Sequence, residues 1–280
     1  MRIKITADST CDLSPKVLEA HDIAVVPLYV VKGGRVFRDG VDITPTEIFK
    51  YVEETGRYPS TAAVSPYDYD VHFEKYAAGY DAVIHVSLGS DFSQCHRNAL
   101  AAAAKYKNVY VFDSKNLSTG QGLLTLEAAR MAERGLNPEN ILQELQLLRD
   151  KVETSFLLDR LDYIYKGGRC SLATALGANI LHLRTCVEVS GGRMMVKKKY
   201  RGSYESAVAA YIRDRLAGRR DVRRGTVFVT HSGVPRSVVQ AARSALLRSA
   251  DFNEVLETRA GCAVSCHCGP MTLGVLFMTE

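Results

Sequence analysis

The stretch AVIHVSLGSDFSQCHRNALAAAAKYKNVYVFD, residues 82–113, predicts a buried strand, a polar loop, an alanine-rich helix to about residue 106 and a second strand. The same order recurs on both sides of it. Residues 3–7 are an apolar run before a helix start at Ser14-Pro15, and after residue 118 one helix runs to residue 134 and another starts at Asn137-Pro138. Strands connected by helices in this way form a parallel sheet with helices on both faces.

The rest of the first half contains a hairpin and two more helix starts. Residues 24–31 are an apolar run, and the glycine-containing turn at residues 32–35 sends the chain back. The sequences Thr44-Pro45 and Ser65-Pro66 are typical of helix N-termini. Between them, residues 59–61 (PST) are predicted to be a loop.

The second half of the chain predicts a sheet of a different kind. The turn Gly191-Gly192 joins two β-runs into an antiparallel hairpin, which lies inside a series of strands and helices. We therefore expect a mixed sheet. The predicted strands are residues 154–158, 185–190, 193–200, 226–230, 255–258 and 273–278, and the predicted helices are residues 161–165, 171–180, 204–216 and 235–247.

These patterns predict an α/β protein of two domains, with a parallel-sheet α/β/α domain at residues 1–153 and a mixed-sheet α/β domain at residues 154–280. The chain has 46% hydrophobic and 24% charged residues, which is ordinary for a soluble protein. No apolar run reaches the ~20 residues that a membrane-spanning helix needs. Residues 1–8 enter a strand directly, without a signal-peptide pattern, so a cytoplasmic location is expected.

Basic residues outnumber acidic ones, and the net charge is +5. They cluster at residues 197–199 (KKK) and 219–224 (RRDVRR). Such clusters can bind phosphates or an acidic protein surface. Because the chain shows no aromatic interleaving and no recognisable nucleic-acid module, a solvated surface is the preferred interpretation. A nucleic-acid-binding or regulatory role is the third hypothesis for this protein.

The seven cysteines are irregularly spaced, which indicates reduced thiols rather than a disulfide framework. Cys262, Cys266 and Cys268 surround His267 and have the composition of a metal-ligand cluster. Their spacing matches neither paired CxxC ligands nor a zinc finger. No metal and no cofactor is therefore predicted.

Hydroxyl and carboxylate groups follow three of the predicted strands. They lie in Asp8-Ser9-Thr10, in residues 89–93 (GSDFS) and in Asp113-Ser114. Ligands of open α/β sheets bind beyond the carboxyl ends of the strands, and helix N-termini attract anions, so these loops predict a site for a small anionic group. Alternatives stay open for single residues: Asp8 and Ser9 as helix caps, Ser93 as a helix-start hydroxyl, and Thr61 bonded within its own loop.

The segment Cys266-His267-Cys268-Gly269-Pro270 interrupts the apolar pattern before the last predicted strand. Gly and Pro impose an unusual backbone path, and His binds or releases a proton near neutral pH. A hydrolase or phosphotransfer enzyme that uses Ser93 with His267 or His231 is the alternative that these residues allow. Against it, the sequence has no G-x-S-x-G elbow and no evident orienting acid.

A glycine pair, Gly167-Gly168, precedes Arg169. Paired glycines let the backbone approach another group closely, and Arg169 could then bind a carboxylate or a phosphate. A helix end followed by a solvated arginine is the alternative. Neither GxGxxG nor GxxxxGK[ST] occurs, so the chain lacks a nucleotide-binding fingerprint, which disfavours an autonomous kinase or dehydrogenase.

In their order along the chain, these motifs resemble those of the DegV family, the bacterial fatty-acid-binding proteins also called FakB. The resemblance runs nearly end to end. It is carried by residues 7–13 (ADSTCDL), 58–62 (YPSTA) with Ser65-Pro66, 113–115 (DSK), 120–122 (GQG), 161–169 (LDYIYKGGR), His231-Ser232-Gly233 and His267-x-Gly269-Pro270. The sequence departs from the family pattern at residues 90–96 (SDFSQCH), at Cys266 and Cys268, and at Met271.

The resemblance implies a two-domain protein that buries one long-chain fatty acid between its domains. It implies a carrier without turnover of its own, which presents the carboxyl group to a separate ATP-dependent fatty acid kinase; the acyl-phosphate made there feeds phospholipid synthesis. By the family's motifs, Thr61, Ser93 and His267 would hold the carboxylate, and Gly269 belongs to the same ligand-binding set. Arg169 would lie near the head group or on the surface that faces the kinase. The length and unsaturation of the acyl chain stay open.

Overall fold

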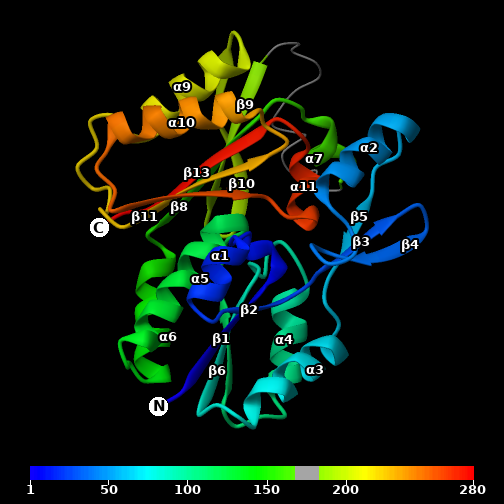
Figure 1. Ribbon diagram of the computed structural model, residues 1–280, viewed down its shortest axis with the longest axis vertical. Helices are drawn as coiled ribbons and strands as arrows, with labels where there is room; N and C mark the ends of the chain where they lie inside the picture. Colours follow the sequence, from blue (N-terminus) through cyan, green and yellow to red (C-terminus); the bar gives the residue numbers. More distant parts are fainter. Residues whose placement is uncertain (168–182) are drawn as a thin grey trace.

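The computed structural model describes residues 1–167 and 183–280 (Figure 1). Its strands are β1 Ile3–Asp8, β2 Ala24–Val26, β3 Tyr29–Lys32, β4 Arg35–Arg38, β5 Ser60–Ala62, β6 Ala82–Ser87, β7 Val109–Asp113, β8 Val152–Leu158, β9 Leu183–Ser190, β10 Arg193–Arg201, β11 Thr226–Ser232, β12 Glu254–Arg259 and β13 Thr272–Met278. Its helices are η1 Ser9–Cys11, α1 Pro15–Ala20, α2 Pro45–Thr55, α3 Pro66–Ala77, α4 Cys95–Ala103, α5 Ser118–Glu133, α6 Pro138–Arg149, α7 Asp162–Lys166, α9 Tyr204–Leu216, α10 Arg236–Ser249 and α11 Cys262–Cys268. The predicted helix at residues 171–180, Gly168 and Arg169 lie outside the described residues.

The N-terminal half builds a parallel sheet with the strand order β2-β1-β6-β7. Strand β6 is buried on both faces, and its successive side chains point to opposite sides. Ile84 and Val86 pack with α5 and α6, whereas Val83 packs with α3 and α4. Figure 1 shows these two helix pairs on opposite sides of the lower sheet. The predicted parallel-sheet architecture is therefore confirmed.

The second half builds a larger sheet in the order β10-β9-β8-β13-β11-β12. Strands β11 and β12 are parallel and the other neighbours are antiparallel, which confirms the predicted mixed sheet. In β13, Leu273 and Val275 pack in the cluster formed with α9 and α10, while Thr272 and Gly274 line a cavity on the opposite face. The boundary predicted between residues 153 and 154 lies inside β8, the strand that opens this sheet, and it stays a prediction.

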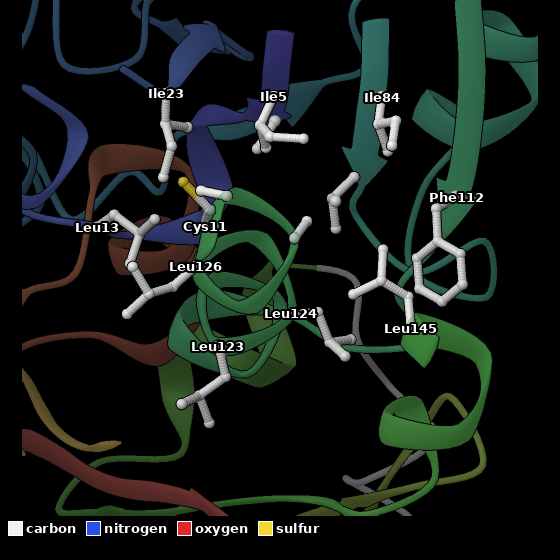
Figure 2. Packing of buried hydrophobic residues seen from close by; sticks show 14 of the residues in the cluster. Ile5, Cys11, Leu13, Ile23, Ile84, Phe112, Leu123, Leu124, Leu126 and Leu145 are labelled. Atoms are coloured by element: carbon white, nitrogen blue, oxygen red, sulfur yellow. The ribbon is translucent and has the colours of Figure 1, made fainter. Parts of the chain in front are cut away.

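Helix α5 joins the two sheets. Its residues Leu123, Leu124 and Leu126 belong to one buried cluster with Ile84 of β6 and Leu276 of β13. Figure 2 shows the leucines of α5 surrounded by side chains from η1, β1, β6, β7 and α6. Most residues of α5 are buried, which explains why its sequence is apolar or small around most of its circumference; its charged residues Glu127, Arg130 and Glu133 lie toward its C-terminal end, where the helix reaches solvent.

A small antiparallel sheet, β4-β3-β5, stands beside the parallel sheet (Figure 1). The apolar run at residues 24–31 contains two strands, because β2 joins the parallel sheet and β3 begins only after Pro27, which has no N–H to donate to a strand pair. The predicted turn at residues 32–35 joins β3 to β4. The loop predicted at residues 59–61 is wrong for its last two residues, because Ser60–Ala62 pairs with β3 as β5, with Thr61 opposite Val30.

The segment around His267 is the short helix α11, where the sequence pattern predicts only a break between two strands. Its sequence, CAVSCHC, contains mostly residues of weak helix propensity. The first turn is capped instead by carboxyl groups from far along the chain. Asp12 accepts the N–H of Gly261 at 2.8 Å, and Asp39 accepts the N–H of Cys262 at 2.6 Å. Tertiary contacts therefore supply the acceptors that a helix start needs.

Candidate ligand-binding site

A cavity of about 400 Å³ lies between the two sheets. The segments that follow β1, β6 and β7 line one side of it, and residues of β8, β11 and β13 line the other. Strand β5 and helix α11 also contribute to the wall. The cavity therefore lies beyond the carboxyl ends of the parallel strands, which is the position predicted for a ligand in an open α/β sheet.

Thr61 and His267 meet in the wall of this cavity although 206 positions separate them in the chain. Strand β5 presents Thr61 and the last turn of α11 presents His267, with 2.8 Å between Thr61 Oγ1 and His267 Nε2. Gly167 lies against the imidazole, because a Cβ at this position would stand 2.5 Å from His267 Nδ1. The close backbone approach predicted for the glycine pair is thus found at Gly167, and the group approached is His267.

Ser93 lines the same cavity from the loop between β6 and α4. Its Oγ accepts the backbone N–H of Cys95 at 3.2 Å, so it is the helix-start hydroxyl considered from the sequence. Its hydroxyl hydrogen donates to the sulfur of Cys95 at 3.2 Å, and sulfur is a weak acceptor. A stronger acceptor in the cavity can therefore draw this hydrogen away.

The other polar loop residues predicted for the anion site are mostly engaged in the fold. Asp8 is not a helix cap, because its carboxylate accepts the N–H of Leu88 at 2.7 Å and the hydroxyl of Tyr69 at 2.5 Å. Ser9 donates to Asp39 at 2.8 Å. Asp113 accepts backbone N–H groups of the loops after β6 and β7. These side chains order the loops that present Ser93.

The hydroxyls deeper in the cavity give their hydrogens to protein acceptors. Thr10 donates to Gln121 at 2.9 Å, Thr154 to Asn116 at 2.7 Å and Thr272 to the carbonyl of Cys268 at 2.9 Å. What remains for a ligand on these side chains is methyl surface and oxygen lone pairs. Sequence reasoning placed Thr10 in the anion site and missed Thr154 and Thr272, because the residue types alone do not show where a hydroxyl hydrogen points.

Gly269 follows α11 directly, and its φ of +73° lies in the region that favours glycine. A Cβ there would stand 2.6 Å from the ring of Tyr163 in α7, so Gly269 contacts an aromatic ring beside the site. It thereby lets α11 and α7 pack closely behind His267. Its direct contact with a ligand, and the role of Arg169, stay predictions.

Asp12 and Asp39 form a buried acidic pair at the start of α11, and sequence reasoning missed both. Each carboxylate has an oxygen within 3.2 Å of the position that a Cβ of Gly261 would occupy. Burial raises the pKa of Asp12 from an ordinary value of 3.8 to about 8, and the nearby Asp39 adds to the shift; hydrogen bonds from Ser118 and Gly261 oppose it. The helix that carries His267 therefore rests on a carboxyl group that holds its proton unusually tightly.

The stability of the protein is expected to fall between about pH 4 and pH 8 because of Asp12. In this window the folded state keeps the proton and the unfolded chain, with an Asp12 pKa near 3.8, releases it, so raising the pH favours unfolding. Asp12→Asn removes this proton equilibrium and keeps an oxygen for the N–H of Gly261. Urea unfolding at several pH values should show that, between pH 4 and pH 8, the free energy of unfolding of the variant rises by more than about 2 kcal/mol relative to wild type. If the free energies of the two proteins change with pH in parallel, the assignment to Asp12 is wrong.

The cysteines near the site are neutral thiols. Burial raises the pKa of Cys262 and of Cys268 to about 12, so neither is a thiolate at neutral pH. Across residues 1–167 and 183–280, no three His, Cys, Asp or Glu side chains are grouped as a metal ion would require. In the same two ranges, every helix is too short or too polar to cross a membrane.

Comparisons with known proteins agree over the full length of the chain. The model of a family described as "Uncharacterised protein, DegV family" matches residues 2–280. A DegV domain-containing protein of Clostridium acetobutylicum is 31% identical over 283 residues, which cover 100% of this chain and 99% of that protein. A protein of Thermotoga maritima named "Fatty acid-binding protein" is 30% identical over 285 residues, which cover 98% of this chain and 96% of that one.

Solved structures show the same fold. A DegV family protein from Thermus thermophilus, described for its fatty acid binding, superimposes with a TM-score of 0.90 at 30% identity, covering 100% of both chains. A DegV lipid-binding protein from Thermotoga maritima superimposes with a TM-score of 0.87 at 27% identity, covering 100% of this chain and 99% of the other. The chain described here therefore belongs to the DegV family.

Proposed function

We propose that this protein binds one long-chain fatty acid in the cavity between its sheets, with the carboxylate at Thr61, Ser93 and His267. The observation that carries the proposal is the division of the cavity wall. Hydroxyl groups that can turn to a ligand lie at the Thr61 and Ser93 end, whereas the deeper hydroxyls are bonded to the protein. The Thermotoga maritima and Thermus thermophilus relatives, both described as binding fatty acids, support it.

The apolar wall suits an acyl chain. Leu28, Leu88, Phe156, Ile164 and Leu276 line the cavity from elements of both halves of the molecule. Each methylene that leaves water contributes about 0.8 kcal/mol. A chain of roughly sixteen carbons therefore gains on the order of 10 kcal/mol, which is enough to retain it without strong polar contacts along its length.

The polar end suits a carboxylate. When His267 Nε2 carries a hydrogen, it donates to Thr61 Oγ1, and the Thr61 hydroxyl is free to donate to the ligand. Ser93 supplies a second hydroxyl. Hydrogen bonds to an ionised carboxylate are stronger than those between neutral groups, so they offset the cost of removing the head group from water. Arg169 stays a candidate for the same head group.

The position of the polar end suits presentation to a partner enzyme. Thr61, Ser93 and His267 are half-buried, while Thr154 and Leu276 at the deeper wall are buried. A carboxyl group held at the half-buried end stays within reach of another protein while the chain is enclosed. We therefore propose a carrier without turnover of its own, which offers the carboxyl group to a fatty acid kinase for acyl-phosphate formation.

The alternative hypothesis is an enzyme with Ser93 as nucleophile and His267 as base. It requires the Ser93 hydroxyl to lie within hydrogen-bonding distance of the His267 ring. In the structure His267 Nε2 bonds to Thr61 and the Ser93 hydroxyl bonds to Cys95. His231 Nε2 lies 3.7 Å from Glu257, and burial lowers the pKa of this histidine. These contacts favour the carrier over the hydrolase.

Most cations of the basic clusters form ion pairs within the protein, which favours a solvated surface over a nucleic-acid site. Lys197 and Lys198 form ion pairs with Glu188 and Asp214 at 3.3 and 2.5 Å. Arg219 pairs with Glu153 at 2.7 Å. Cations already matched by carboxylates have less charge to offer to phosphates.

Organic extraction of the denatured, purified protein is expected to release one fatty acid per chain, because the apolar side chains that line the cavity favour the binding of an acyl chain. Mass spectrometry of the extract identifies it and gives its length and unsaturation. The same protein, incubated with an acyl ester, should release no product. An empty extract, together with failure to take up any labelled fatty acid, would refute the carrier; ester hydrolysis that Ser93→Ala abolishes would establish the enzyme instead.

A further inference from the structure

A row of buried polar side chains extends from Ser93 into the N-terminal half. The proposed function uses only Ser93 itself. Cys95, Tyr69 and Asp8 behind Ser93 are each 0% exposed. The Ser93 hydroxyl donates to the sulfur of Cys95 at 3.2 Å, and the Tyr69 hydroxyl donates to Asp8 Oδ1 at 2.5 Å. The hydroxyl of Tyr69 lies near the Cys95 thiol and contributes to the pKa shift of that group. The four side chains therefore lie in a row, with hydrogen bonds from Ser93 to Cys95 and from Tyr69 to Asp8.

Hydrogen-bond directions along this row can be assigned starting from Asp8. Tyr69 has one hydroxyl hydrogen and gives it to Asp8, so its oxygen faces the Cys95 thiol as an acceptor. Burial raises the pKa of Cys95 to about 11, so the thiol keeps its hydrogen near neutral pH and can donate it to Tyr69. The sulfur is then left as the acceptor for the hydroxyl of Ser93.

The two contacts of Ser93 with Cys95 have different strengths. The backbone N–H of Cys95 donates to Ser93 Oγ at 3.2 Å and holds the oxygen at the start of α4. The hydroxyl hydrogen is held only by sulfur, a weak acceptor, whereas a carboxylate oxygen is a strong one. The oxygen is thus fixed in place while its hydrogen can turn toward a ligand at small cost.

We propose that Cys95 is a positioning residue that sets the preference of the site for a carboxylate head group, by holding the hydrogen of Ser93 weakly and releasing it to the ligand. This inference rests on the proposed function. An ionised carboxylate has no hydrogen to give and needs the one on Ser93. A fatty alcohol of the same chain can instead donate its own hydrogen to Ser93 Oγ. The ratio of acid affinity to alcohol affinity therefore reports on Cys95.

The test compares wild type, Cys95→Ser and Cys95→Ala in their binding of hexadecanoic acid and hexadecan-1-ol, by displacement of a fluorescent fatty acid from delipidated protein. A serine hydroxyl at position 95 is a stronger acceptor than sulfur, so Cys95→Ser should lower the acid-to-alcohol ratio about fivefold. Cys95→Ala leaves the Ser93 hydrogen without this acceptor, so its ratio should equal or exceed that of wild type. The acid-to-alcohol ratio is therefore expected to be lowest in Cys95→Ser, higher in wild type, and as high or higher in Cys95→Ala.

The Ser93→Ala background supplies the control for a structural effect. Cys95→Ser should leave the ratio unchanged there, because the hydrogen on which it acts is gone. If acid and alcohol weaken together in Cys95→Ser, or if the ratio still changes in Ser93→Ala, the inference is overturned. If wild type binds neither compound, the proposed function fails and the inference falls with it. If wild type binds the acid and the acid-to-alcohol ratio is the same in wild type, Cys95→Ser and Cys95→Ala, the inference alone is overturned.

Discussion

His267→Ala is expected to weaken the binding of a long-chain fatty acid by on the order of 10- to 100-fold, the range for a lost hydrogen bond to a charged group. His267 Nε2 lies 2.8 Å from Thr61 Oγ1, so the variant removes the N–H that orients the Thr61 hydroxyl and that stands beside the proposed position of the carboxylate. The cost of desolvating the carboxylate stays in full. Titration of delipidated protein with a fluorescent fatty acid measures the loss.

His21→Ala is the matched control for this variant. The imidazole of His21 pairs with Glu133 at 2.7 Å on the surface, and it does not line the cavity. Its removal should leave fatty acid affinity unchanged. His267→Gln, which restores an N–H donor on a side chain of similar reach, should recover part of the affinity. Equal affinity in His267→Ala and His21→Ala would show that the carboxylate does not lie at His267.

Gly120→Ala is expected to lower the free energy of unfolding by about 3 kcal/mol or more, through overpacking and the loss of a buried hydrogen bond. Gly120 lies in the first turn of α5, and a Cβ there would overlap Asn116 Oδ1 and Thr154 Oγ1. These two atoms form a hydrogen bond of 2.7 Å that links the loop after β7 to β8 of the larger sheet. The new methyl group must break this bond or displace α5.

Gly79→Ala serves as the comparison. A Cβ at Gly79 meets no atom within 4 Å, and this glycine is outside the positive-φ group. Its replacement should change the free energy of unfolding by less than about 0.5 kcal/mol. Urea unfolding followed by circular dichroism measures both variants. Similar midpoints for Gly120→Ala and Gly79→Ala would show that α5 can shift to accommodate the methyl group.

The sequence predicted those parts of the fold that depend on neighbours within a few residues. Both predicted helix starts are found: the Ser65 side chain accepts the N–H of Asp68, and Thr44 forms a capping box with Glu47. The hairpin around Gly191-Gly192 joins β9 to β10. Strands β6 and β7 have the bounds expected from their apolar runs. Local hydrogen bonds and side-chain periodicity suffice for these features.

The candidate site was predicted as a set of residues and not as a geometry. Thr61, Ser93 and His267 follow from the resemblance to the DegV family, and all three line one cavity. The residues alone did not indicate that Thr61 belongs to a strand or His267 to a helix. They also did not indicate the contact of the Ser93 hydroxyl with the buried thiol of Cys95.

By itself, then, the sequence determined the α/β class, the parallel and the mixed sheet, and the family. Only the tertiary structure decided which polar groups face the ligand. Helix α11 exists because Asp12 and Asp39 supply acceptors for its first turn, and His267 meets Thr61 only when β5 and α11 are packed together. A hydrogen bond depends on the distance and direction between two atoms, and for partners 206 positions apart the whole fold sets both.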